Sequence, residues 1–201
     1  MYWRPVVGFI SREGYSAPEA QDLAQEFFLA VLEGKLLNSA TPSRGRFRSL
    51  LLMSLKNFLI DAKIKAGRRK RGGDAVFVAL QDWDSDMPAS CSPETLFDVR
   101  WAVTIAEEAV RRLREECESK GRRNLYEVLS QYLDADRKEI SYRAISAQLG
   151  ISEKTVKNLI HEFRKRFRSL LREEVGKTVQ NPAEVEDEIR YLCGALASLP
   201  L

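Results

Sequence analysis

The sequence predicts an all-α protein with two small helical domains joined by a flexible acidic linker, the second domain containing a helix-turn-helix. Apolar residues recur every three or four positions through most of the chain, and no window alternates apolar and polar residues over the length of a strand. The charges also fall in blocks of opposite sign. We therefore expect a first domain at residues 1–72, the linker at 73–98, a second domain at 99–176 and an acidic C-terminal tail with a short helix at 177–201.

The composition is that of a globular binding protein. Of the 201 residues, 44% are hydrophobic and 30% are charged, which is enough apolar material for packed cores. The longest apolar run, residues 50–53, is far shorter than the roughly 20 residues of a membrane span. The first residues show no charged segment followed by an apolar stretch, so we do not expect a secretory signal. Three distant cysteines and a single histidine argue against a disulfide framework, a multi-histidine metal site and His-based catalysis. We expect a cytoplasmic protein without enzymatic activity, metal or cofactor.

The first domain is predicted to hold two main helices. Apolar residues from Ala20 to Leu32 follow one helical stripe, and Ser16 with Glu19 has the spacing of a capping box. A loop at residues 41–45 precedes a longer helix with an apolar face from Phe47 onward.

A helix start is predicted near the end of the linker, with Ser92 as its N-cap and Pro93 at its first position. Apolar residues at helical spacing mark this helix over 99–113, and two further helices over 125–133 and 156–171.

The net charge of +3 hides a strong segregation along the chain. Residues 44–72 carry ten basic residues and one acid, residues 74–98 carry six acids and no base, and residues 138–172 carry nine bases and three acids. Two basic blocks separated by an acidic linker favour two contacts with a polyanion, although solvated helix faces would be the plainer explanation.

The spacing within residues 141–160 indicates a helix-turn-helix. Ser146 supplies a small residue where two helices cross, Gly150 admits the positive φ of the turn, and Val156 anchors the second helix. Ser152 can cap that helix. The side chains left for a DNA major groove are Glu153, Lys154, Lys157, Asn158 and His161, and phosphate-binding charge follows at Arg164, Lys165, Arg166 and Arg168. The competing interpretation is a plain helical hairpin with a glycine turn.

The first basic block suggests a second DNA contact. A Pro-Ser-Arg-Gly-Arg loop leads into the helix whose polar face offers Arg48, Lys56, Asn57 and Lys63. Arginine and lysine fit phosphates, and asparagine can hold a base edge. Favourable interaction with a helix C-terminus and simple surface polarity are the alternatives for these side chains.

Three stretches of the first domain, residues 22–28, 47–51 and 55–61, resemble region 2 of the sigma-70 family of bacterial RNA polymerase sigma factors, specifically its extracytoplasmic-function (ECF) group. Residues 142–168 resemble region 4 of that group, in the expected order. The resemblance covers about residues 2–71 and 99–172. It implies a sigma factor that binds core polymerase and directs promoter recognition and DNA opening.

The resemblance also implies roles for individual residues. It places Asp22, Gln25 and Glu26 on the β′ clamp helices of core RNA polymerase. It assigns the −10 promoter element to Arg44, Arg46, Arg48, Lys56, Asn57 and Lys63. It assigns the −35 element to Arg143, Ser152, Glu153, Lys154, Thr155, Lys157, Asn158, His161 and Arg164. Promoter DNA, core polymerase and an anti-sigma factor are the partners that such a protein would take.

Two features depart from the family pattern. Members have a further N-terminal helix, so region 2 is expected to be truncated, and Leu50 stands where an aromatic residue often stacks on melted bases. The alternative function is a helix-turn-helix regulator that binds duplex DNA without polymerase. A DNA-processing enzyme would need clustered carboxylates or a nucleophile, and the acids of 74–98 lack helical spacing. The acidic C-terminal block fits either a docking tail or a cover over the basic helix.

Overall fold

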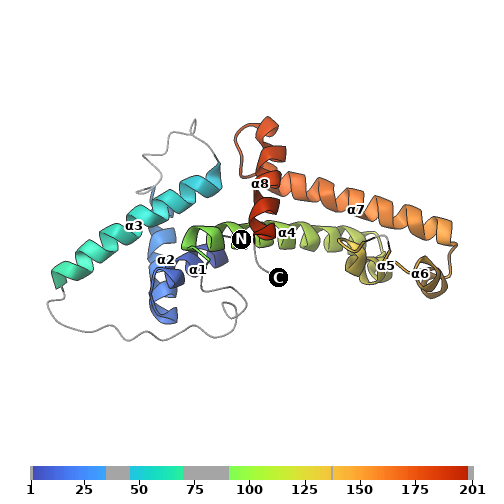
Figure 1. Ribbon diagram of the computed structural model, residues 1–201, viewed down its shortest axis with the longest axis horizontal. Coiled ribbons are helices and arrows are strands. Elements are labelled where there is room, and N and C mark those ends of the chain that lie inside the picture. Colours follow the sequence, from blue (N-terminus) through green and yellow to red (C-terminus); the bar gives the residue numbers. More distant parts are fainter. Residues whose placement is uncertain (1, 35–45, 70–90, 137, 199–201) are drawn as a thin grey trace. The chain divides into compact units, whose positions relative to one another are not determined.

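The computed structural model describes residues 2–34, 46–69, 91–136 and 138–198 (Figure 1). Over these ranges every regular element is helical, which confirms the all-α prediction. The elements are α1 (Trp3–Arg12), α2 (Ala17–Leu32), α3 (Phe47–Arg69), α4 (Pro93–Ser119), α5 (Arg123–Leu129), η1 (Ser130–Tyr132), α6 (Tyr142–Leu149), α7 (Glu153–Gly176), η2 (Pro182–Glu184) and α8 (Val185–Ala197). Among the helices of these ranges, none combines the length and the hydropathy that crossing a bilayer demands.

The chain forms two compact units. Unit 1 comprises Met1–Thr104 together with Val175–Leu201, and unit 2 comprises Ile105–Glu174. Most of the expected linker, residues 73–90, lies outside the described residues, while 93–98 belong to α4. The four predicted ranges, 1–72, 73–98, 99–176 and 177–201, stay predictions.

Local sequence signals set the predicted helix starts. The Ser16 backbone N–H donates to Glu19 Oε2 at 3.0 Å, which closes the capping box of α2. The Thr95 backbone N–H donates to Ser92 Oγ at 3.1 Å, so Ser92 caps α4. Both caps confirm the sequence prediction.

The core of unit 1 is built from α1, α2, α3 and the first half of α4. Phe9 of α1 and Phe27 of α2 are fully buried, and their rings contact Phe97 and Phe58 at centroid distances of 6.2 and 5.6 Å. Sequence periodicity singled out no stripe for α1. A Cβ on Gly8 would lie 1.8 Å from the guanidinium of Arg100, so a larger residue there would make the Arg100 side chain shift.

The C-terminal segment packs into unit 1 through a buried ionic cluster. Glu188 of α8 is 0% exposed, and its Oε1 accepts a 2.9 Å hydrogen bond from Arg48 Nε. Arg46 Nη1 lies 2.9 Å from Glu188 Oε2 as an ion pair without hydrogen-bond alignment. Arg48 also pairs with Asp98, whose second oxygen accepts from the Tyr191 hydroxyl at 2.5 Å. α8 therefore contacts the start of α3 directly.

The core of unit 2 joins the second half of α4 to α5, α6 and most of α7. Its buried side chains are Ala109, Leu113, Val128, Leu129, Ile140, Ile145, Val156, Ile160, Phe163 and Leu170. These residues fix one face of α7 against the core and leave its other faces for contacts outside it.

Candidate nucleic-acid interface

The turn between α6 and α7 has the geometry that the sequence predicts. Gly150 ends α6 with φ 68° and ψ 29°, a left-handed conformation that glycine adopts without strain. Just beyond it, the Ile151 backbone N–H donates to Ser146 O at 3.2 Å, and the Ser146 hydroxyl donates back to Ile151 O. Small Ser146 thus ties the turn to the first helix.

The second helix of the motif is fixed at its start. The Thr155 backbone N–H donates to Ser152 Oγ at 3.2 Å, so Ser152 acts as the predicted cap, and the two hydroxyls lie 2.9 Å apart. Val156 is 0% exposed and Ile145 of α6 is 1% exposed. The helix-turn-helix is therefore confirmed, with α7 as the helix that would enter a groove.

A row of basic side chains runs along the outer face of α7. Its members, separated by three or four residues and all exposed, are Lys154, Lys157, His161, Lys165 and Arg168. We call this set the α7 basic stripe. It extends for about 21 Å at 1.5 Å per residue, with exposed Asn158 beside its N-terminal half. A straight row of this length, with positive charges at Lys154, Lys157, Lys165 and Arg168, suits a polyanionic backbone.

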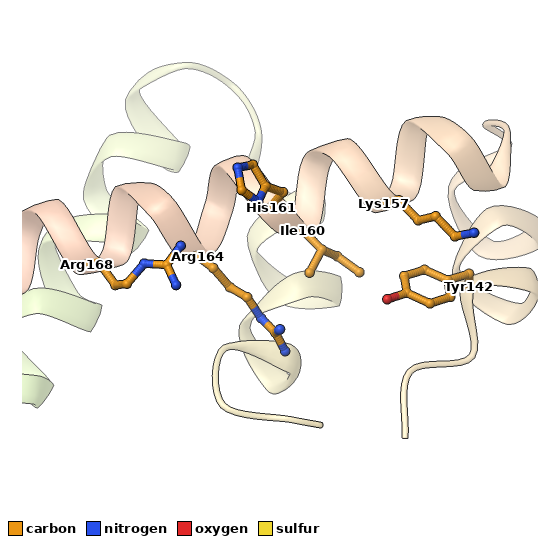
Figure 2. Close-up of a pocket in the computed structure, with 6 residues that line it drawn as sticks. All are labelled: Tyr142, Lys157, Ile160, His161, Arg164 and Arg168. Atoms are coloured by element: carbon orange, nitrogen blue, oxygen red, sulfur yellow. The ribbon is translucent and has the colours of Figure 1, made fainter. Parts of the chain in front are cut away.

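The stripe borders a cavity in unit 2 (Figure 2). The cavity has a volume of about 700 Å³ and is lined by Tyr142, Lys157, Ile160, His161, Arg164 and Arg168. Lys157 reaches over the ring of Tyr142, with its Nζ 5.1 Å from the ring centroid. An apolar floor with a cationic rim can receive an anion such as a phosphate. Tyr142 was not among the site residues predicted from sequence.

Arg164 differs from the expectation that it contacts DNA. Its Nε and Nη2 donate to the Tyr132 carbonyl oxygen at 2.8 and 2.6 Å, and Nη2 also donates to Ala135 O. These carbonyls follow α5, so the guanidinium is engaged in holding that end of unit 2 in place.

Arg166 also points away from the α7 basic stripe. Its Nε donates to Glu116 of α4 at 2.8 Å, and its Nη1 lies 3.1 Å from Glu173 Oε1. Arg112 of α4 pairs with Glu173 at 2.7 Å and with Glu174 at 2.6 Å. Of the four bases that the sequence grouped over 164–168, only Lys165 and Arg168 therefore lie on the stripe. Helical spacing from His161 excludes Arg166, five residues on, but not Arg164, three residues on, so spacing alone could not separate Arg164 from Lys165 and Arg168.

The remaining residues of the predicted −35 set lie around the same motif. Arg143 is exposed on the second position of α6, and Glu153 is exposed at the first position of α7. Thr155 is exposed at the third position of α7, beside its cap Ser152. The structure thus brings these residues to one end of the helix pair. Their promoter role stays a prediction.

Four of the six predicted −10 residues are paired with acids of unit 1. Arg44 lies outside the described residues, and Arg46 pairs with Glu188. Arg48 is only 5% exposed, and its guanidinium forms ion pairs with Asp98 and Glu188. In this conformation it is therefore not available to a phosphate. Lys56 pairs with Glu94 at 2.6 Å and Lys63 with Glu13 at 2.9 Å, both near the surface, while Asn57 is exposed.

Asp22, Gln25 and Glu26 are all exposed on the outer face of α2, opposite buried Ala24 and Phe27. The three residues therefore share one face of α2. Their role at a polymerase interface stays a prediction that rests on the resemblance.

Comparison with known families gives a different identification from that resemblance. Residues 133–177, which include α6 and α7, match the helix-turn-helix domain of the M protein trans-acting positive regulator (MGA). No curated protein and no solved structure matches the chain. The sigma-70 prediction is therefore wrong, because the matching family is a regulator with a helix-turn-helix and not a sigma region. The spacing of Ser146, Gly150 and Val156 suits any helix-turn-helix and could not separate the two.

Proposed function

We propose that this protein is a transcription regulator that binds duplex DNA through α7 and needs no RNA polymerase for that binding. The observation that carries the proposal is the α7 basic stripe on the second helix of a capped and anchored helix-turn-helix. The similarity of residues 133–177 to the helix-turn-helix domain of a regulator supports it.

The N-terminal half of α7 is the part that reads sequence. In this class of motif the first residues of the second helix face base edges while the first helix crosses the backbone. Lysine at position 157 can donate to guanine O6 and N7, and the neighbouring Asn158 can pair with the N6 and N7 of adenine. Both side chains are exposed and lie within two turns of the Ser152 cap.

The C-terminal half of the stripe supplies affinity without sequence preference. Lys165 and Arg168 lie about three and a half and four and a half turns beyond the Ser152 cap, where the helix leaves the groove and meets the phosphate backbone. Arg168 also borders the 700 Å³ cavity, together with Lys157 and Tyr142. A backbone phosphate held at this rim would fix the register of α7 on the duplex.

The protein would regulate transcription by occupying a DNA site, and no catalysed reaction is assigned to it. We expect such a regulator to act in the cytoplasm.

The test is selection of bound sequences from a random duplex library with the purified full chain and no polymerase. We expect enrichment of one motif, and we expect Lys157→Ala/Asn158→Ala to relax preference at two or three adjacent base pairs. Each lost base contact should reduce discrimination by about 1–3 kcal/mol. The matched control is Arg123→Ala/Asn124→Ala, which removes one cation and one asparagine from the exposed surface of α5. Absence of an enriched motif, or equal relaxation in the control, would contradict the proposal.

A further inference from the structure

Large apolar side chains are exposed on only one of the two units. Within the described residues, those that remain exposed are Trp3, Leu29, Leu32, Met53, Ile60, Ile64, Val103, Tyr191 and Leu196, all of them in unit 1. The described residues of unit 2 contribute none, although they include the α7 basic stripe. A surface for a protein partner is therefore to be sought on unit 1.

Three of these side chains form a single row on α3. Met53 is 66% exposed, Ile60 is 55% exposed and Ile64 is 49% exposed. With Asn57 between them, the positions follow each other by four, three and four residues, which is the spacing of the a and d positions of a coiled coil. Taking Asn57 and Ile64 as a positions makes Met53 and Ile60 d positions. We call this set the α3 seam.

The opposite face of α3 is already occupied by the core of unit 1. Leu51, Leu55 and Leu59 are 1%, 0% and 2% exposed. The seam therefore takes no part in folding this unit, and leaving two isoleucines and a methionine half-exposed in water has no benefit for a monomer.

We infer that the α3 seam is the interface through which two copies of this chain associate, as a parallel pair of α3 helices. An asparagine at a single a position, among apolar neighbours, is the device by which two-stranded coiled coils fix register and stoichiometry. In a parallel pair Asn57 lies beside Asn57 of the second copy, where the two amides can hydrogen-bond to each other.

The charges beside the seam select the parallel orientation. Lys56 and Lys63 lie at g positions, and exposed Asp61 lies at an e position. In a parallel pair each g residue faces the e residue five positions further on the other helix, so Lys56 meets Asp61 of the second copy. In an antiparallel pair the g positions face each other, which brings lysines together. The pair of Lys56 with Glu94 does not prevent this contact, because both side chains are more than 40% exposed, at 42% and 45%.

The inference goes beyond DNA binding by unit 2 and does not depend on it. The test is sedimentation equilibrium of the full chain, without DNA. At protein concentrations up to about 100 μM, even a dimer with a micromolar dissociation constant would be populated. We expect a dimer for the wild type. Ile60→Asp places a carboxylate in the seam and should raise the dimer dissociation constant by about 30-fold or more.

Leu29→Asp is the matched control, because Leu29 is 58% exposed on the outer face of α2 and should leave the dissociation constant unchanged. Asp61→Lys should weaken the dimer, and added salt should reduce the difference from wild type. Asn57→Leu should give tighter association or higher oligomers. Thermal unfolding followed by circular dichroism checks that each variant is folded. A monomeric wild type, or equal effects of Ile60→Asp and Leu29→Asp, would overturn the inference.

Discussion

Lys165 and Arg166 are consecutive cations of α7 that the structure gives opposite surroundings. Lys165 is exposed on the α7 basic stripe, whereas Arg166 contacts Glu116 and Glu173 on the side facing α4. Changing either residue to glutamine removes one positive charge at nearly the same place and leaves helix propensity almost unchanged. The two variants therefore separate DNA binding from folding.

The expected magnitudes follow from these contacts. A cation that neutralises one phosphate contributes about 0.9 to the slope of log K against log salt, so Lys165→Gln should lower the absolute slope by about 0.9 and leave stability within about 0.5 kcal/mol. Arg166→Gln should leave the slope unchanged. It should lower the free energy of unfolding by about 1 kcal/mol, because its partners Glu116 and Glu173 are partly exposed and solvent screens the pairs.

The assay is fluorescence anisotropy of a labelled duplex, titrated with protein at several salt concentrations, together with urea unfolding of each variant. The opposite pattern, a reduced slope for Arg166→Gln and an unchanged slope for Lys165→Gln, would show that α7 does not meet DNA with the face that the structure exposes. Equal slopes for both variants and the wild type would exclude Lys165 as a phosphate contact.

Three further predictions concern stability. Glu188→Ala leaves buried Arg48 without one of its two carboxylates and should cost about 3–5 kcal/mol in urea unfolding. Gly150→Ala meets no atom within 4 Å, so its cost should be only that of the left-handed backbone, about 1–2 kcal/mol. Hydrogen bonds from Arg166 and Arg112 hold the pKa of Glu116 and Glu173, respectively, below the ordinary 4.5. The folded state therefore binds fewer protons than the unfolded state. The stability that these two pairs contribute should be complete above about pH 4.5 and lost as the pH falls through the lowered pKa values. A urea midpoint that is the same at about pH 3 as above about pH 4.5 would contradict this prediction.

Features that depend on neighbours three to five residues away could be predicted from the sequence. The capping box at Ser16 and the cap at Ser152 are local contacts between a side chain and the first turn of a helix. The turn at Gly150 needs only a residue that accepts positive φ. The starts of α2, α4 and α7 and the helix-turn-helix therefore followed from local chemistry and apolar periodicity, whereas α1 was not predicted.

The roles of the arginines could not be predicted, because their partners are distant in the chain. Arg48 meets Glu188 140 residues further on, Arg166 meets Glu116 50 residues back, and Arg164 donates to Tyr132 32 residues back. No periodicity or charge count contains these pairings. A basic block in the sequence thus overstates the charge that the folded protein presents, most strongly at residues 44–72, where Arg46 and Arg48 face acids of the same unit.

The α3 seam and the α7 basic stripe together make one prediction that neither makes alone. A chain that dimerises through unit 1 presents two copies of α7, so binding of the second copy to a duplex with two half-sites is intramolecular. Ile60→Asp should then weaken binding to such a duplex by about 100-fold and leave binding to a single half-site unchanged. Lys157→Ala should weaken both, because it acts within each α7. Anisotropy titrations with the two duplexes distinguish these outcomes, and an equal loss on both duplexes for Ile60→Asp would place the seam in DNA contact instead of self-association.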